Sequence, residues 1–111
     1  MNNLITLHPE WLGLIELDQA GTVLYSRLEK GGARLDINGR NFYSEVAAFK
    51  NVEDFHRLVD AFTEGRDQAG GFIFNCDFND GAVLVRVLLA RISERSNGAR
   101  TKSILVHLRR A

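Results

Sequence analysis

Apolar and polar side chains alternate most clearly in the C-terminal half of the chain, with the period of two that predicts β-strands. Residues 72–78 would place three phenylalanines and Cys76 on one face, where Cys76 is expected to be a small core residue. Residues 82–92 and 101–109 continue the pattern and predict two longer strands. Turn signals such as Asn79-Asp80-Gly81 separate the three segments, so consecutive antiparallel hairpins are expected.

The N-terminal half carries a second set of short apolar runs. Residues 12–18 and 22–26 are joined by a turn that contains Gly21, which predicts another hairpin. Residues 28–40 are rich in glycine and asparagine and predict a loop or short helical turns. Residues 41–50 mix apolar and polar side chains, and one or two short helical turns are expected there.

The clearest helical pattern covers residues 51–65. Four apolar side chains recur there at i, i+3, i+4 and i+7 and predict one buried stripe: Phe55, Leu58, Val59 and Phe62. The side-chain oxygen of Asn51 is expected to cap the first turn by accepting from its free N–H groups. Gly65 is expected to end the helix with a positive φ.

Two strands, a helical middle and three strands predict an α+β fold, with a five-stranded antiparallel sheet and helices packed on one face. The other face of the sheet, which carries Arg86, His107 and Arg109, is expected to stay open to water or to a partner. Residues 12–111 have the length of a single domain, preceded by an N-terminal segment, residues 1–11.

The composition limits the classes of partner that the chain is expected to bind. The 111 residues contain 14 Lys plus Arg and 14 Asp plus Glu, so no long-range field attracts nucleic acid or an anionic membrane. No apolar run approaches the length of a membrane span, and the start of the chain lacks the pattern of a signal peptide. A single cysteine allows no intramolecular disulfide, so a cytoplasmic protein is expected.

The sequence contains few residues that could form a catalytic or metal-binding site. The chain has no nucleophile-elbow motif, no phosphate-binding glycine loop and no dinucleotide fingerprint. His8, His56 and His107 lack the spacing of metal ligands, and the lone cysteine adds no ligand pair. The sequence therefore predicts a protein that is not an enzyme and holds no metal.

Residues 39–49, Gly-Arg-Asn-Phe-Tyr-Ser-Glu-Val-Ala-Ala-Phe, together with the element order, resemble the PAS domain family, and its photoactive yellow proteins in particular. The resemblance extends over roughly residues 12–111 and implies a PAS fold and a sensory or signalling module. Phe49 stands where those proteins attach a dye to cysteine, so no covalent cofactor is expected. Phe42 likewise stands at the reactive cysteine of flavin-binding relatives.

The resemblance also implies a pocket for a small apolar or phenolic ligand, bound without a covalent bond. Tyr25 and Glu29 have the spacing of the tyrosine and glutamate that hold the phenolic oxygen of the dye in photoactive yellow proteins. Aromatic side chains would complete the wall of this pocket: Phe42, Phe49 and Phe62.

Two alternatives stay open beside this ligand-binding sensor. Phe49 could plug the cavity, which would leave a ligand-free docking or dimerisation module. The other alternative is a haem-based gas sensor with His56 as the weak candidate for the iron ligand, although its helical position would turn it toward solvent. The resemblance implies a homodimer and a protein signalling partner in either of the first two cases.

Overall fold

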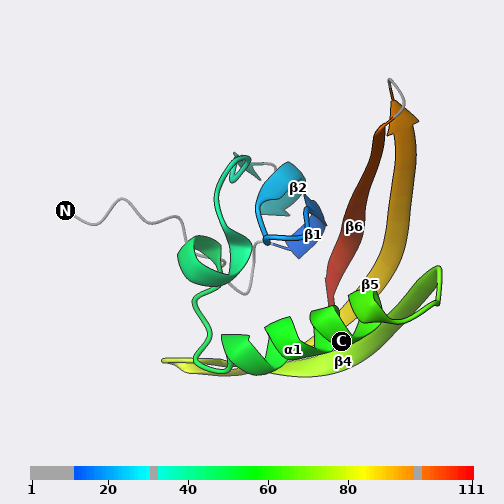
Figure 1. The fold of residues 1–111 in the computed structure, drawn as a ribbon. Helices are drawn as coiled ribbons and strands as arrows, with labels where there is room; N and C mark the ends of the chain where they lie inside the picture. Colours follow the sequence, from blue (N-terminus) through cyan, green and yellow to red (C-terminus); the bar gives the residue numbers. More distant parts are fainter. Residues whose placement is uncertain (1–11, 31–32, 97–98) are drawn as a thin grey trace.

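A computed structural model describes residues 12–30, 33–96 and 99–111 (Figure 1). These residues form one antiparallel sheet of six strands, in the spatial order β3-β2-β1-β6-β5-β4. The strands are β1 (Leu12–Leu17), β2 (Val23–Lys30), β3 (Ala33–Leu35), β4 (Ala69–Phe78), β5 (Gly81–Ser96) and β6 (Ala99–Arg110). Between β3 and β4 lie η1 (Phe42–Val46), a single π-helical turn, and α1 (Val52–Glu64).

The prediction of a five-stranded sheet is wrong, because β3 adds a sixth strand at one edge. The segment 28–40, predicted as a loop or short helical turns, contains the end of β2 and the whole of β3. Leu35, Arg34 and Ala33 pair in antiparallel register with the last three residues of β2. A strand of three residues is too short to show a period of two, so only its backbone pairing reveals it. The mixed α+β content is as expected.

Alternation places the apolar side chains as the pattern predicts in β4 and β6. Phe74, Cys76 and Phe78 are buried, whereas the residues between them are exposed. In β6 the buried apolar face comprises Ile104, Val106 and Leu108.

Helix α1 covers one face of the sheet and packs mainly against β4, β5 and η1 (Figure 1). Phe55 and Val59 are buried and Phe62 is half-buried, as the stripe predicts. Leu58 is 42% exposed, so the prediction is wrong at this position. The sheet and η1 cover only a narrow arc of the helix, and Leu58 lies outside that arc. No helix among the described residues is long and apolar enough to cross a membrane.

Both ends of α1 differ from the prediction. The amide of Asn51 makes no capping bond; its Oδ1 accepts from the Asp77 N–H at 3.0 Å and its Nδ2 donates to the Asn75 carbonyl at 2.8 Å. Asn51 therefore ties the start of the helix to β4. Gly65 has φ −81°, an ordinary extended conformation, because other contacts hold this end of the helix.

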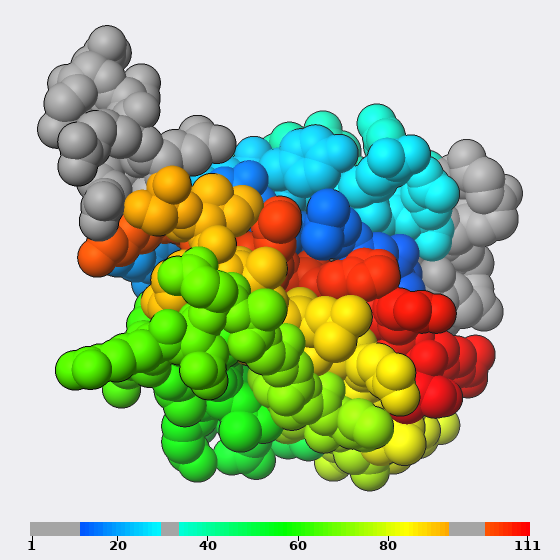
Figure 2. Space-filling view, turned by 90° about the vertical axis from the view of Figure 1, so that its right-hand side faces the viewer, coloured from blue at the N-terminus to red at the C-terminus, as the bar shows by residue number. Residues whose placement is uncertain are grey.

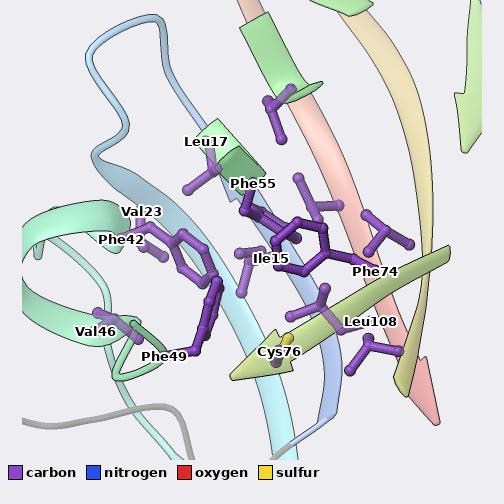
Figure 3. Close-up of a cluster of buried hydrophobic side chains, with 14 of the residues drawn as sticks. Ile15, Leu17, Val23, Phe42, Val46, Phe49, Phe55, Phe74, Cys76 and Leu108 are labelled. Atoms are coloured by element: carbon purple, nitrogen blue, oxygen red, sulfur yellow. The ribbon is translucent and has the colours of Figure 1, made fainter. Parts of the chain in front are cut away.

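The core lies between α1, η1 and the covered face of the sheet (Figure 3). Phe49 lies near its centre and is 3% exposed. Its ring centroid lies 5.6 Å from that of Phe55, 5.9 Å from Phe74 and 5.8 Å from Phe78, in tilted or edge-to-face contacts. Such aromatic pairs contribute about 0.5–1.5 kcal/mol each beyond their burial.

Candidate functional site

The structure does not bring the five residues of the predicted ligand pocket together. Phe42 and Phe49 are buried in the core. Phe62 lies at the rim, where the guanidinium of Arg91 is 5.1 Å from its ring centre. Tyr25 is 43% exposed, and the Glu29 carboxylate is an exposed partner of Arg27 at 3.8 Å.

Strand geometry explains this separation. Ser26 and Leu28 point into the core, so Tyr25 and Glu29 point to the opposite face of β2. The backbone of the sheet therefore stands between these two polar groups and the phenylalanines. The i, i+4 spacing of Tyr25 and Glu29 keeps them on one face, but no sequence signal fixed which face that would be.

The face of the sheet away from α1 forms the first candidate site, and we call it the outer face (Figure 2). In that view β2 in cyan, β1 in blue, β6 in red and β5 in yellow lie side by side. Tyr25 and Leu88 are each 43% exposed there, Leu84 is 49% and Ile73 is 55% exposed. Large apolar side chains of this kind, gathered on one face, are typical of a surface that contacts another protein.

Charged side chains lie among these apolar residues on the outer face. Arg86 and Arg109 are exposed and directly opposite each other on β5 and β6. Glu29 lies in the same row two strands further on, because it pairs with Leu12 on β1 and Gly13 pairs with Leu108. Like charges opposite each other destabilise a sheet, so Arg86 and Arg109 would gain from an acidic partner.

A pocket on the helix side of the sheet forms the second candidate site. It has a volume of about 330 Å³ and lies between α1, the β1–β2 turn, and strands β5 and β6. One wall is a stacked pair, in which the rings of Tyr43 and His56 are 3.7 Å apart and 10° from parallel. The Nε2 atom of His56 lies 3.4 Å from an Asp60 carboxylate oxygen.

Local structure positions the Tyr43 ring. Gly21 has φ +89°, and a Cβ atom there would lie 2.8 Å from Tyr43 Cδ2, so only glycine lets the ring approach the turn. Asn41 caps η1 by accepting from the backbone N–H of Tyr43 at 3.1 Å. Burial, and then the nearby Asp60 carboxylate, raise the pKa of the Tyr43 phenol. The phenol therefore stays protonated and available as a donor.

Arg91 closes the end of the pocket and caps α1. Its Nη2 donates to the carbonyls of Phe62 at 2.8 Å and Gly65 at 3.0 Å, and its Nη1 donates to that of Thr63 at 2.9 Å. These oxygens belong to the negative end of the helix dipole, where a cation is stabilising. Sequence reasoning missed this role. The sequence did contain a signal for it. Arg91 continues the alternation that places Val85, Val87 and Leu89 on the inward face of β5.

His56, the haem-ligand candidate, is half-buried with its ring against Tyr43. In residues 12–30, 33–96 and 99–111, no three metal-ligating side chains come together. Haem binding stays a prediction of the PAS resemblance. Cys76 is buried in the core, where burial raises the pKa of its thiol to about 11.

No family model matches this chain, and no curated protein matches its sequence. Membership of the PAS family therefore stays a prediction from residues 39–49 and the element order. The outer face and the pocket are therefore the two features of the structure from which a function can be inferred.

Proposed function

We propose that this chain is a PAS-type docking module in which two copies pair through their outer faces. The observation that carries the proposal is the set of exposed apolar side chains on the outer face, which no element among the described residues covers. A sheet with helices on one side alone leaves its other side for water or for a partner. The zero formal net charge adds no long-range repulsion between two copies.

The packing of Phe49 favours docking over a ligand held in the interior. Its ring is buried against three other phenylalanine rings, which occupy the centre of the space between the helices and the sheet. Well-packed interiors hold few voids larger than a water molecule. A signal would therefore be passed by association at the surface, not by a ligand in the core.

Charge placement favours a second copy as the occupant of the outer face. Sheets packed face to face keep their strand directions within about 30°. A twofold axis that runs along the strands between β1 and β6 would place β2 of one copy over β5 of the other. Glu29 of each copy would then lie opposite Arg86 of the other, because both belong to the same row. Each interface would form two such pairs, as twofold symmetry requires.

The proposal includes a protein signalling partner and a cytoplasmic location. The PAS assignment is based on residues 39–49 and on a helical middle with strands before and after it, and the structure has three strands on each side of that helical middle. A dimer through the outer face would leave α1 and η1 accessible to the signalling partner. The single buried thiol is compatible with a reducing compartment.

Sedimentation equilibrium of the purified chain and two leucine variants tests the pairing. Leu88 on the outer face and Leu58 on α1 are 43% and 42% exposed, so they form a matched pair. Leu88→Lys would place a charge in the interface, and we expect it to weaken dimerisation at least about tenfold. Leu58→Lys is expected to leave dimerisation unchanged.

A chain that stays monomeric at the highest accessible concentration would contradict the dimer. A dimer that Leu58→Lys dissociates and Leu88→Lys does not would place the interface on α1 instead. Circular dichroism of each variant confirms that the fold is retained, which both exposed positions lead us to expect.

A further inference from the structure

The pocket beside α1 has the size and the walls of a small-molecule site. Its volume of about 330 Å³ is at the small end of the range of about 300–1,000 Å³ that is usual for ligand pockets. It lies on the opposite side of the sheet from the outer face, so a dimer through the outer face would leave this pocket open. The pocket also lies beside the phenylalanine core and not within it.

The floor of the pocket is apolar. Leu17 at the end of β1 and Ile104 on β6 pair across the sheet, and Val59 of α1 lies among the other lining residues. All three side chains are nearly or fully buried. The stacked rings of Tyr43 and His56 extend this surface on one side. An aliphatic group of a few carbons would find apolar contact here.

The polar lining carries both signs of charge. Carboxylates come from Asp18 at the β1–β2 turn and Asp60 on α1, and the protonated phenol of Tyr43 lies near Asp60. Asp18 Oδ1 accepts from the N–H groups of Ala20 and Thr22 at 2.9 Å each, which fixes this carboxylate at the turn.

Cations come from strands β5 and β6. Arg91 on β5 and Lys102 on β6 both line the pocket, and both lie on the inward-facing side of their strands. The guanidinium of Arg91 has five N–H groups, and its contacts to Phe62, Thr63, Gly65 and Asp67 use four of them. Among the described residues the fifth N–H has no acceptor, so a carboxylate in the pocket could meet it together with the ammonium of Lys102.

We propose that this pocket binds a free α-amino acid with an aliphatic side chain. The α-ammonium group would lie between Asp18 and Asp60. The α-carboxylate would lie toward Lys102 and Arg91, and the side chain would rest on Leu17, Val59 and Ile104. A ligand with one charge alone would leave either the carboxylates or the cations of the lining without a counterion.

Amide-resolved NMR titration with L-leucine tests this assignment, with 4-methylpentanoate and 3-methylbutan-1-amine as probes that each lack one charge. We expect leucine at millimolar concentration to shift the amide resonances that line the pocket, and we expect each analogue to bind at least about tenfold more weakly. Asp60→Asn and Lys102→Gln are each expected to weaken leucine binding by a similar factor. Asp54→Asn, an exposed change on the same helix, is expected to leave it unchanged.

Three results would overturn the assignment. The first is the absence of leucine-induced shifts at millimolar concentration. The second is an affinity for either analogue equal to that for leucine, because the carboxylates and the cations of the lining would then not select the ligand. The third is a set of shifts confined to the outer face. A sedimentation run with leucine present separates this test from that of the dimer, since the two sites lie on opposite sides of the sheet.

Discussion

At the scale of single residues, Phe49 decides what the interior can hold. The resemblance to photoactive yellow proteins predicts that an aromatic ring stands where those proteins attach a dye, but the sequence could not show whether the ring plugs the space or lines it. The structure places the ring against Phe55, Phe74 and Phe78. Packing of this kind depends on contacts between segments far apart in the chain, which no local pattern encodes.

Truncation of Phe49 measures this packing. Phe49→Ala is expected to lower the free energy of unfolding by about 3–5 kcal/mol, because it removes a buried ring and leaves a cavity. Apolar cavities of that size bind benzene. Benzene or phenol is therefore expected to raise the Tm of the variant and not that of the parent chain.

Phe72→Ala is the control, since Phe72 is half-buried at the margin of the same cluster. It is expected to cost less stability and to create no benzene site. Equal stabilisation of the parent chain by benzene would show that the interior already holds an open cavity, and it would favour the ligand-binding alternative.

Cys76 makes the free energy of unfolding depend on pH, and its raised pKa gives the direction of that dependence. The thiol pKa is about 11 in the folded chain and about 8.5 in an unfolded one. Between these values the unfolded chain loses a proton that the folded chain keeps. The free energy of unfolding contributed by Cys76 is therefore intact below about pH 8.5 and falls as pH rises to about 11, by at most about 1.4 kcal/mol per pH unit.

Urea denaturation of the parent chain and of Cys76→Ala across this range measures the contribution. The alanine variant is expected to lose stability less steeply above about pH 9, whereas the difference between the two chains stays constant at neutral pH. Parallel slopes over the whole range would show that the thiol titrates equally in both states.

At the scale of elements, the sequence predicted the long strands, the first hairpin and α1, because each has a strong period of two or 3.6. The prediction from sequence failed where backbone pairing with a neighbouring strand, and not a hydrophobic period, defines the element. Strand β3 and the last residues of β5 are held by backbone registers with a neighbouring strand. Asn51 could either cap a helix or bridge to a strand, and only the position of β4 decides between these.

A substitution of Arg91 tests how much its cap at the end of α1 contributes to stability. Arg91→Met keeps most of the side-chain length and removes the donors to Phe62, Thr63 and Gly65. We expect a loss of about 1–3 kcal/mol in the free energy of unfolding, because the half-buried carbonyls of Phe62 and Thr63 lose a charged partner. Hydrogen exchange is expected to quicken in the last turn of α1.

Arg57→Met provides the matched control on the same helix. The Arg57 guanidinium lies 3.3 Å from the Asp54 carboxylate, and both side chains are exposed. Exposed pairs contribute about 0–1 kcal/mol. A loss in Arg91→Met no larger than in Arg57→Met would mean that Arg91 does not stabilise the helix end.

At the scale of the whole molecule, the two faces of the sheet have separate roles in this account. The covered face holds a filled aromatic core and a small pocket at its margin. The outer face holds apolar side chains with Arg86 and Arg109 in one part and Glu29 in another. The sequence predicted that this face would be open, but the row that relates Glu29 to Arg86 follows only from the strand registers.

A charge exchange between Glu29 and Arg86 tests the pairing of two outer faces most directly, with the dimer dissociation constant from sedimentation equilibrium as the readout. Glu29→Lys and Arg86→Glu are each expected to weaken the dimer about tenfold, because each places like charges across the interface. The double variant is expected to recover most of that loss. A double variant as weak as the sum of the two single changes, or single variants as tightly dimeric as the parent, would contradict the account.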